Sequence, residues 1–396
     1  MKTMDIQKVR KDTPGTLHHN HLNNAGAALM PIQVMEAIRS YQDLEFEMGG
    51  YEAMAKEHKS FQSFYQEGAR FLQTKPENIA WSTSATDAYN KALSSFPLLP
   101  GDYLLTTIND YVANQIAFLH LQKRRGIKLL RAEDLPTGGV DLESMESLIK
   151  QYRPKVVAVT HMPTNSGLIQ PVEAIGALCK KYETWYLVDA CQTAGQLPLD
   201  VEKIGCDYLS LTMRKFVRGP RGGGLLFASD RVLEKGLEGV YPDGYGSTWT
   251  DADTYQPDKT AKRFEYFERN YSILLGSAAA MAYANDLGLD SIQNRVTTLA
   301  DHLRQKMQNN KGWQVMDKGE KLGGIVTLFH PDLEGKQVHK TLMEHSINNS
   351  VAGVYNAVID MHNKGIFWAL RLSPHYYNTV EEVDEAVDVL EKMIKK

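Results

Sequence analysis

The stretch YLSLTMRKFVRGPRGGGLLFAS (residues 208–229) decides how the rest of this chain is interpreted. Its two apolar ends, 208–212 and 224–229, have the length and composition of buried β-strands. The turn between them carries four cations and no acidic residue: Arg214, Lys215, Arg218 and Arg221. An ordinary turn mixes charges of both signs. This one is predicted to hold a small negatively charged group.

The same strand pattern extends towards the N-terminus. Strand-like runs are predicted at 78–82, 103–108, 127–132, 155–161 and 185–190, in addition to 208–212 and 224–229. The segments between them carry apolar residues at helical spacing of three and four. Alternating strands and helices are typical of a mostly parallel sheet covered on both faces. We therefore expect an α/β fold with a mostly parallel seven-stranded sheet.

Three regions are expected from the change of pattern along the chain. Residues 1–40 form an N-terminal segment that joins the small domain, 41–261 form the large domain, and 262–396 form a smaller α+β domain. Helices are expected at 31–48, 51–73 and through 270–307, and short strands at 313–316, 324–329 and 368–373. The polar, aromatic loop 241–263 is long enough to serve as a lid or interface element.

Composition narrows the classes of function. The 396 residues carry a net charge of −4, so no general basic field favours nucleic acid or an anionic membrane surface. The apolar runs are too short to span a bilayer, and the N-terminus has no apolar signal-peptide core. The three cysteines lack a CxxC spacing, which disfavours a metal site and indicates reduced thiols in a cytoplasmic protein.

Polar residues follow the predicted strands at the sheet edge where parallel strands present ligands. TSATDA (83–88) opens a helix whose N–H groups would suit a phosphate, although an ordinary helix cap has the same pattern. Asp189 ends one apolar strand, where it could pair with a cation or simply cap the next turn. Lys215 lies just past another strand, among cations that would lower its pKa. A phosphate seat, an acid and an amine together match pyridoxal phosphate (PLP).

The chain resembles the class V aminotransferase family of PLP enzymes, of fold type I, which includes cysteine desulfurases, C–S lyases and isopenicillin N epimerase. The resemblance rests on the segments HLNNAGAALMP (21–31), DACQTAGQ…RGGGLLF (189–227), RFEYFERNYSILLG (263–276) and LRLSPHYYNTVEEVDEAVDVL (370–390). It implies that Lys215 forms the Schiff base with PLP and that Asp189 pairs with the pyridine nitrogen. It also implies a homodimer with the site at the interface, which the loop 241–263 could reach.

Further roles follow from the resemblance alone. Tyr111 would stack on the ring and could act as a catalyst, and Thr164 takes a position that is often asparagine in desulfurases. Gln192 would contact the ring's phenolic oxygen. The phosphate would be bound by Ala85, Thr86, Thr212 and Arg214, although many members have histidine in place of Arg214. Arg371 would clamp the substrate carboxylate, and Asn24 and Ala25 would line the substrate side.

Several reactions at the α-carbon of an amino acid are open to such a site. Persulfide transfer is disfavoured because Cys206 is the last cysteine of the chain. We favour a C–S β-lyase that releases pyruvate and ammonia, because THMPTNSGL and RKFVRGPRGGG look most like the sulfoxide C–S lyases of the ergothioneine pathway. An aminotransferase, or an epimerase with Tyr111 as second proton donor, remains an alternative. A non-enzymatic protein of this fold is disfavoured because Lys215 and Asp189 are both present.

Overall fold

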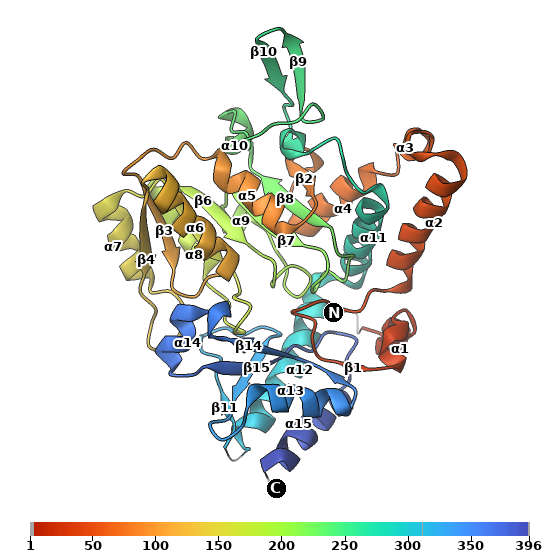
Figure 1. The fold of residues 1–396 in the computed structure, drawn as a ribbon, viewed down its shortest axis with the longest axis vertical. Coiled ribbons are helices and arrows are strands. Elements are labelled where there is room, and N and C mark those ends of the chain that lie inside the picture. The colour runs from red at the N-terminus through yellow and green to blue at the C-terminus, as the bar shows by residue number, and fades with distance from the viewer. Residues whose placement is uncertain (1–3, 311, 395–396) are drawn as a thin grey trace.

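The computed structural model describes residues 4–310 and 312–394. Its centre is a seven-stranded sheet of order β2-β8-β7-β6-β5-β3-β4 (Figure 1). The strands are β2 Ile79–Ser82, β3 Tyr103–Thr107, β4 Lys128–Ala132, β5 Val156–Thr160, β6 Trp185–Asp189, β7 Tyr208–Thr212 and β8 Gly224–Ala228. The pairs from β4 to β7 are parallel, and β8 is antiparallel to both of its neighbours. The expected seven strands and mostly parallel sheet are confirmed.

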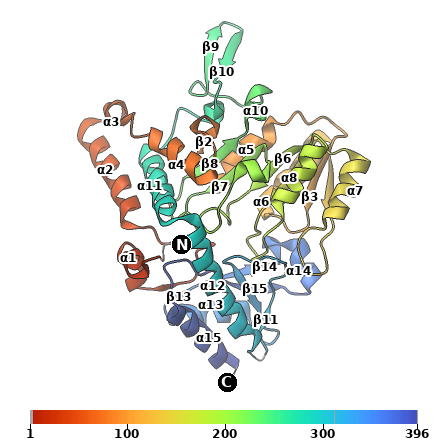
Figure 2. The ribbon, with the colours of Figure 1, turned by 180° about the vertical axis from the view of Figure 1, so that it is seen from behind.

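Alternating side chains of the strands pack into different hydrophobic clusters. Val157 and Val159 of β5 join a cluster with α7 (Leu142–Tyr152), α8 (Val172–Lys181) and α9 (Val201–Ile204). Ala158 joins the cluster of α5 (Ala85–Ser95) and α6 (Val112–Arg125). This period-two alternation places helices on both faces of the sheet, as Figures 1 and 2 show from opposite sides.

In the part of the chain that the structure describes, four α-helices precede β2, and the last of them packs against this strand. They are α1 Ile6–Lys11, α2 Ile32–Met48, α3 Gly50–Glu57 and α4 Gln62–Leu72, with 3₁₀ turns at Pro14–Leu17 and Pro76–Asn78. The expected helix over 51–73 is therefore two helices, because the polar segment around His58 interrupts it. The expected helical region 270–307 likewise divides at Gly288 (φ +85°) into α11 Tyr271–Leu287 and α12 Leu289–Gln308.

A four-stranded antiparallel sheet of order β11-β12-β15-β14 forms the smaller α+β unit. Its strands are β11 Gln314–Val315, β12 Val326–Phe329, β14 Ser350–Gly353 and β15 Trp368–Leu372, and its helices are α13 Gly335–Glu344, α14 Val358–Lys364 and α15 Val380–Ile394. β1 (Asn20–His21) pairs with β13 (Ile347–Asn348), which ties the N-terminal segment to this unit. Neither β14 nor α14 was predicted from the sequence.

The buried cores bear on the domain boundary expected at residue 262. α11 packs against α2 and α4, and its buried side chains share a cluster with Ile292 and Val296 of α12. The core of the smaller unit begins at Leu299, further along α12. The helix α12 thus contributes to both cores, and Figure 2 shows α11 and α12 running from the upper to the lower unit.

The remaining elements lie between β8 and α11. They are α10 Asp230–Glu234, a 3₁₀ turn at Ala261–Phe264, and the hairpin of β9 (Ser247–Asp251) and β10 (Thr254–Pro257). Figure 1 shows this hairpin projecting away from the rest of the molecule. A further 3₁₀ turn, Val354–Asn356, precedes α14. None of the helices in the described residues is both long and apolar enough to cross a membrane.

Candidate active site

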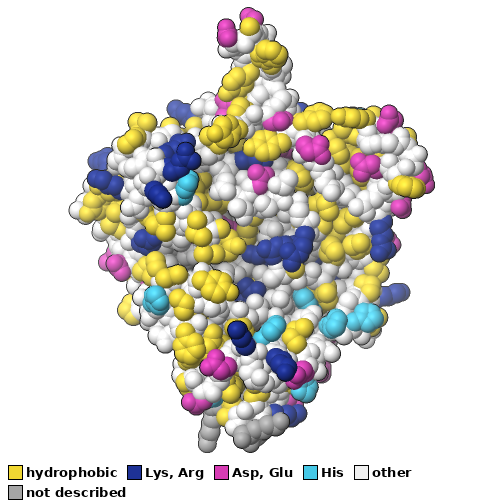
Figure 3. Space-filling model, viewed as in Figure 1, with side chains coloured by type: hydrophobic (Ala, Val, Ile, Leu, Met, Phe, Trp, Pro, Cys, Tyr) yellow, Lys and Arg dark blue, Asp and Glu magenta, His cyan; other side chains and the backbone are white. Residues whose placement is uncertain are grey.

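A cavity lies at the carboxyl ends of β6 and β7, beside the start of α5. Figure 3 shows Lys and Arg side chains gathered in the middle of the same face of the molecule as Figure 1. The residues that line the cavity are Ser84, Ala85, Thr86, Tyr89, Tyr111, Asn114, Asp189, Cys191, Thr212, Arg214 and Lys215. The fold therefore brings seven of the predicted site residues together, although they come from segments over a hundred residues apart.

The start of α5 forms one wall. The hydroxyl of Ser84 accepts the N–H of Asp87 at 3.1 Å, which fixes the first turn so that Ala85 and Thr86 face the cavity. Gly224 of β8 lets the strand approach this turn, because a Cβ there would lie 2.4 Å from the carbonyl carbon of Ser84. Free N–H groups and the positive end of the helix dipole make this wall suitable for a phosphate.

Lys215 follows β7 and is buried against the cavity. Its Nζ lies 5.8 Å from the centre of the Tyr111 ring. Among the described residues it forms no salt bridge, and burial lowers its pKa despite the nearby Asp189. A buried amine with a lowered pKa is the group that condenses with an aldehyde and later accepts a proton.

Asp189 ends β6 and is buried with both oxygens occupied. Oδ1 accepts the N–H of Cys191 at 2.9 Å, and Oδ2 accepts Nδ2 of Asn114 at 3.0 Å. These two donors hold the carboxylate towards the cavity. Asn114 was not predicted from the sequence. The available signal was its position in the first turn of α6, three residues after Tyr111, which directly precedes the helix.

Arg371 reaches the site from β15 of the smaller unit. Its Nη1 donates to the Thr164 hydroxyl at 2.7 Å and carbonyl at 3.2 Å, and Nη2 donates to Oδ1 of Asn23 at 3.2 Å. Its Nε is buried with no partner among the described residues. Burial, with a contribution from Arg214, lowers the pKa of Arg371 to about 10, so the guanidinium stays charged at neutral pH.

Gln192 links this arginine to the cavity. Its Nε2 donates to the Thr164 hydroxyl at 3.0 Å and to the Ala25 carbonyl at 3.2 Å, while its Oε1 is buried without a partner among the described residues. The unpartnered polar atoms of Gln192 and Arg371, the buried amine and the helix start together fit a phosphorylated aldehyde and an amino-acid carboxylate.

Comparison with known proteins supports this interpretation. The family model for class V aminotransferases matches residues 20–386.

The chain belongs to the class V aminotransferase family.

Several known proteins are similar to this chain over nearly its whole length. A protein of Pyrococcus abyssi described as a probable cysteine desulfurase is 28% identical over 401 residues, which cover 98% of each chain. The apo structure of a cysteine desulfurase from Thermococcus onnurineus NA1 matches with a TM-score of 0.91 at 27% identity, and covers 100% of both chains. The structure of the cystine C–S lyase C-DES with cysteine persulfide has a TM-score of 0.84 at 19% identity over 96% of this chain and 99% of that chain, which shows a shared fold.

Membership of the class V aminotransferase family makes this protein a PLP-dependent enzyme. The residues present fit that cofactor. Ala85, Thr86 and Thr212 would hold its phosphate, Lys215 its aldehyde, and Asp189 its ring nitrogen. These assignments remain predictions. The comparisons give no particular closeness to the sulfoxide lyases of the ergothioneine pathway.

Asn24 and Arg214, two of the expected site residues of this class V enzyme, form hydrogen bonds within the protein. Nδ2 of Asn24 donates to the carbonyls of His21 and Ser373, and its Oδ1 accepts the Tyr377 hydroxyl, so its side chain is already occupied in holding the fold. Arg214 lines the cavity, but its Nη1 donates to the carbonyl of Gly26 on the substrate side. Its predicted contact with the phosphate would use its other N–H groups.

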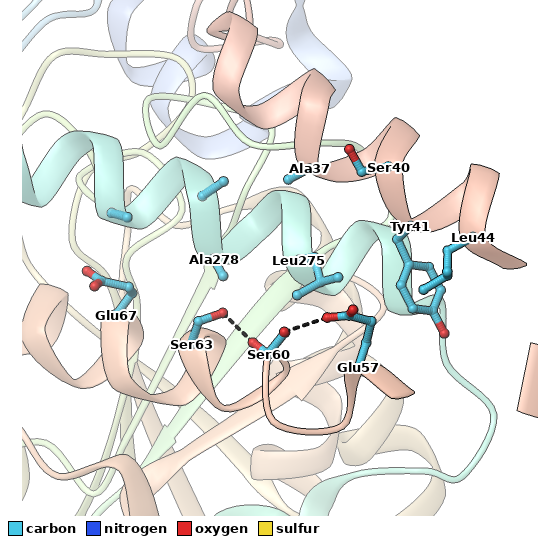
Figure 4. Close-up of a pocket in the computed structure, with 12 residues that line it drawn as sticks. Ala37, Ser40, Tyr41, Leu44, Glu57, Ser60, Ser63, Glu67, Leu275 and Ala278 are labelled. Carbon is cyan, nitrogen blue, oxygen red and sulfur yellow. Dashed lines mark hydrogen bonds between the residues drawn. The ribbon is translucent and has the colours of Figure 1, made fainter. Parts of the chain in front are cut away.

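A second pocket, between α2, α4 and α11, has a different character (Figure 4). The Ser60 hydroxyl donates to Glu57 at 2.5 Å, and Ser63 donates to the Ser60 carbonyl at 2.6 Å. Its lining contains two glutamates but neither lysine nor arginine. Such a pocket offers nothing to an anionic cofactor, in contrast to the cavity around Lys215 and Arg214.

Proposed function

We propose that this PLP-dependent enzyme is a C–S β-lyase that converts a cysteine S-conjugate or sulfoxide to pyruvate and ammonia. The observation that carries the proposal is the absence of any cysteine after Cys206. The relatives are described as cysteine desulfurases. A transfer of sulfur to the protein requires a cysteine thiolate as acceptor.

Cys191 is the one cysteine among the residues that line the cavity. Burial raises the pKa of its thiol well above the ordinary value, and the neighbouring Asp189 raises it further. A protonated thiol beside a carboxylate is a poor nucleophile. We therefore do not assign Cys191 as a sulfur acceptor, and we propose a reaction that needs no protein thiol. A cystine C–S lyase is known on the same fold.

Residues of this chain can supply the binding and proton transfer that the lyase reaction needs once PLP is bound. PLP, when bound, supplies an electron sink at the substrate's α-carbon. Arg371 binds the α-carboxylate, and the amine of Lys215 accepts the α-proton. The electron pair of that C–H bond forms a Cα–Cβ double bond as the Cβ–S bond breaks, and the sulfur departs with its electron pair as a thiolate or sulfenate. The proton taken from Cα is returned to Cβ, which becomes a methyl group, and water then replaces nitrogen at Cα of the three-carbon fragment, which leaves pyruvate and ammonium.

The test is a product assay with PLP-loaded protein. L-cysteine, S-alkyl cysteines and their sulfoxides, including the sulfoxide conjugate of histidine betaine, would each be followed for pyruvate, ammonia, sulfide and alanine. We expect pyruvate from a conjugate or sulfoxide and little from free cysteine. Alanine with released sulfur from cysteine would identify a desulfurase instead. The variant Lys215→Ala should abolish turnover, and the exposed Lys235→Ala should not.

A second candidate is an amino-acid epimerase, and the position of Tyr111 is the observation that supports it. The Tyr111 ring lies next to Lys215, and burial, with Cys191 and Asp189, raises its pKa against the nearby Arg214 and Arg371, so the phenol keeps its proton. A phenol beside two cations could return a proton to Cα. Deuterium uptake at Cα with inversion in heavy water, without pyruvate, would support this candidate. A keto acid together with pyridoxamine phosphate would indicate an aminotransferase.

We also propose that the enzyme is a cytoplasmic homodimer with the site at the interface. The hairpin β9–β10 supports a cross-subunit contact, because Trp249 at 78% exposure and Tyr255 at 51% are large apolar side chains facing solvent. Three unpaired cysteines agree with a reducing compartment. Light scattering on the intact protein and on Trp249→Ser would test the dimer, which predicts twice the chain mass and a weakened association in the variant.

A further inference from the structure

Asp110 is a buried carboxyl group that the proposed reaction does not use. It lies between β3 and α6, directly before Tyr111, and is 5% exposed. Among the described residues it has no cationic partner in a salt bridge. A carboxylate buried without a cation is costly, so the structure must supply hydrogen-bond donors in its place.

Four donors converge on Asp110. Oδ2 accepts the Thr106 hydroxyl at 2.6 Å, and Oδ1 accepts the backbone N–H of Tyr111 at 2.7 Å. Oδ1 also accepts the hydroxyl of Thr160 and, at 3.3 Å, Nδ2 of Asn114. Thr106, Thr160 and Asn114 are all buried, so water does not compete for these contacts. Every one of these groups donates, which suits an ionised acceptor.

Asn114 connects Asp110 to Asp189. Its single amide nitrogen lies 3.3 Å from Oδ1 of Asp110 and 3.0 Å from Oδ2 of Asp189. An amide nitrogen carries two hydrogens: one can go to Asp189, and the other is shared between Asp110 and the Thr160 hydroxyl, which lies 3.3 Å away and itself donates to Asp110. The backbone N–H of Tyr111 is also held, by Asp110 and by Thr160 at 3.2 Å. One carboxylate thus restrains both Tyr111 and Asp189.

We propose that Asp110 is a positioning residue: it orients Asp189 through Asn114, and it fixes the start of α6 that carries Tyr111. The inference rests on the assignment of Asp189 and Tyr111 to the cofactor, but not on the choice of lyase over epimerase or aminotransferase. Asp110 acts on the partner of the ring nitrogen and on the aromatic neighbour of the ring together.

The charge of Asp110 also changes in an accessible range of pH. Burial, together with the nearby Asp189, raises its pKa to about 6 against the effect of its hydrogen bonds. Beside the larger effect of burial, Asp110 also acts to raise the pKa of two other titratable groups, Tyr89 on α5 and Arg131 on β4. Protonation turns an acceptor into a donor. Below about pH 6, the hydrogen bonds from the Tyr111 N–H and the Asn114 amide to Asp110 are therefore weakened.

The experiment compares Asp110→Asn with Asp102→Asn. Asp102 also accepts a backbone N–H, from Leu99 at 2.8 Å, but it lies before the opposite end of β3. Asp110→Asn keeps the shape and replaces one acceptor by an N–H₂ that opposes the surrounding donors. In the PLP-loaded protein, we expect the pH titration of the cofactor's visible absorbance to move by about one pH unit, and the affinity for PLP to fall about tenfold. Asp102→Asn should change neither.

A double variant tests the route through Asn114. If Asp110 acts through that side chain, Asp110→Asn combined with Asn114→Ala should cost no more PLP affinity than the worse single variant. Additive losses, or an absorbance titration of Asp110→Asn that superimposes on the parent, would overturn the proposal. Should Asp110→Asn not fold, Thr106→Val removes one donor to Asp110 alone and must shift the same titration in the same direction. These readouts report on the cofactor and stay valid whatever reaction the enzyme performs.

Discussion

At the scale of the residue, the buried guanidinium of Arg371 is held in one orientation, which suits it to recognise a substrate carboxylate. Its Nη groups are held by Thr164 and Asn23, while Nε has no partner among the described residues. We expect Arg371→Lys to lower kcat/KM for amino-acid substrates by about 10- to 100-fold, because a lysine cannot reproduce a planar, bidentate contact with a carboxylate. Steady-state kinetics would show the loss mainly in KM. An unchanged KM would place the carboxylate elsewhere.

Asp134 is a second residue whose surroundings matter: as a carboxylate, it lowers the free energy of unfolding. Its Oδ1 is buried without a partner among the described residues, and burial, with Asp360 and Glu133, raises its pKa to about 6. Because this pKa exceeds the unfolded value of about 4, the folded state binds the proton more tightly between those values, and stability falls as pH rises through the window. Asp134→Asn should therefore raise the free energy of unfolding by about 1 kcal/mol at pH 8 and by less at pH 5.

Urea unfolding at both pH values would measure this difference. The exposed Glu320→Gln, which also removes one negative charge, is the control and should change stability little at either pH. A gain for Asp134→Asn of equal size at pH 5 and pH 8 would contradict the assignment, since it would not follow the titration of the carboxyl group.

At the scale of the element, the seat for the phosphate depends on how closely β8 approaches α5. A Cβ at residue 224 would lie within 2.8 Å of three backbone atoms of Ser84 and Ala85. We expect Gly224→Ala to displace the start of α5, to destabilise the protein by about 1–3 kcal/mol and to weaken PLP binding. Gly244→Ala is a matched control, because nothing lies within 4 Å of its Cβ position and its φ is not positive.

Equilibrium titration with PLP, together with thermal unfolding of the unloaded protein, would separate the two effects. An affinity for PLP equal to that of Gly244→Ala would mean that the first turn of α5 does not hold the phosphate. A loss of affinity larger than the loss of stability explains would support the seat.

At the scale of the whole molecule, Asp360 on α14 of the smaller unit accepts hydrogen bonds from two loops of the large sheet. Oδ2 of Asp360 accepts Nδ2 of Asn165 at 2.6 Å, and Oδ1 accepts Nδ2 of Asn109 at 3.3 Å. These loops also carry Thr164 and Tyr111. The same carboxylate pairs with the buried Lys364 at 2.8 Å. Asp360 therefore couples the smaller unit to both sides of the candidate site.

We expect Asp360→Ala to lower stability by about 2–3 kcal/mol, because Lys364 is left buried without its partner, and to raise KM as the two loops are released. Adding Lys364→Met should restore part of the stability but leave KM high. Asp388→Ala, on the exposed side of α15, is the control. If the double variant recovers both stability and KM, the hydrogen bonds of Asp360 to the two loops contribute to stability alone.

Much of this architecture could be predicted from local pattern. The apolar runs that became β5, β6 and β7 are short, continuous and bounded by turn residues, which is what a strand buried on both faces requires. The strand β14 has four half-buried residues and α14 only seven residues, so neither shows a clear period. The break at His58 and the hairpin β9–β10 were missed because polar segments give little periodic signal.

The sequence by itself determined the α/β class, the seven strands of the large sheet and the family to which this PLP-dependent enzyme belongs. Each of these depends on spacing along the chain, and residues near one another in sequence carry that information. Only the tertiary structure decided that Arg371 reaches Thr164 and Asn23, that Asn114 bridges Asp110 and Asp189, and that Asp360 clasps two loops. These partners are brought together by the packing of separate elements, and burial then sets the charge state and orientation of each group, which no local pattern encodes.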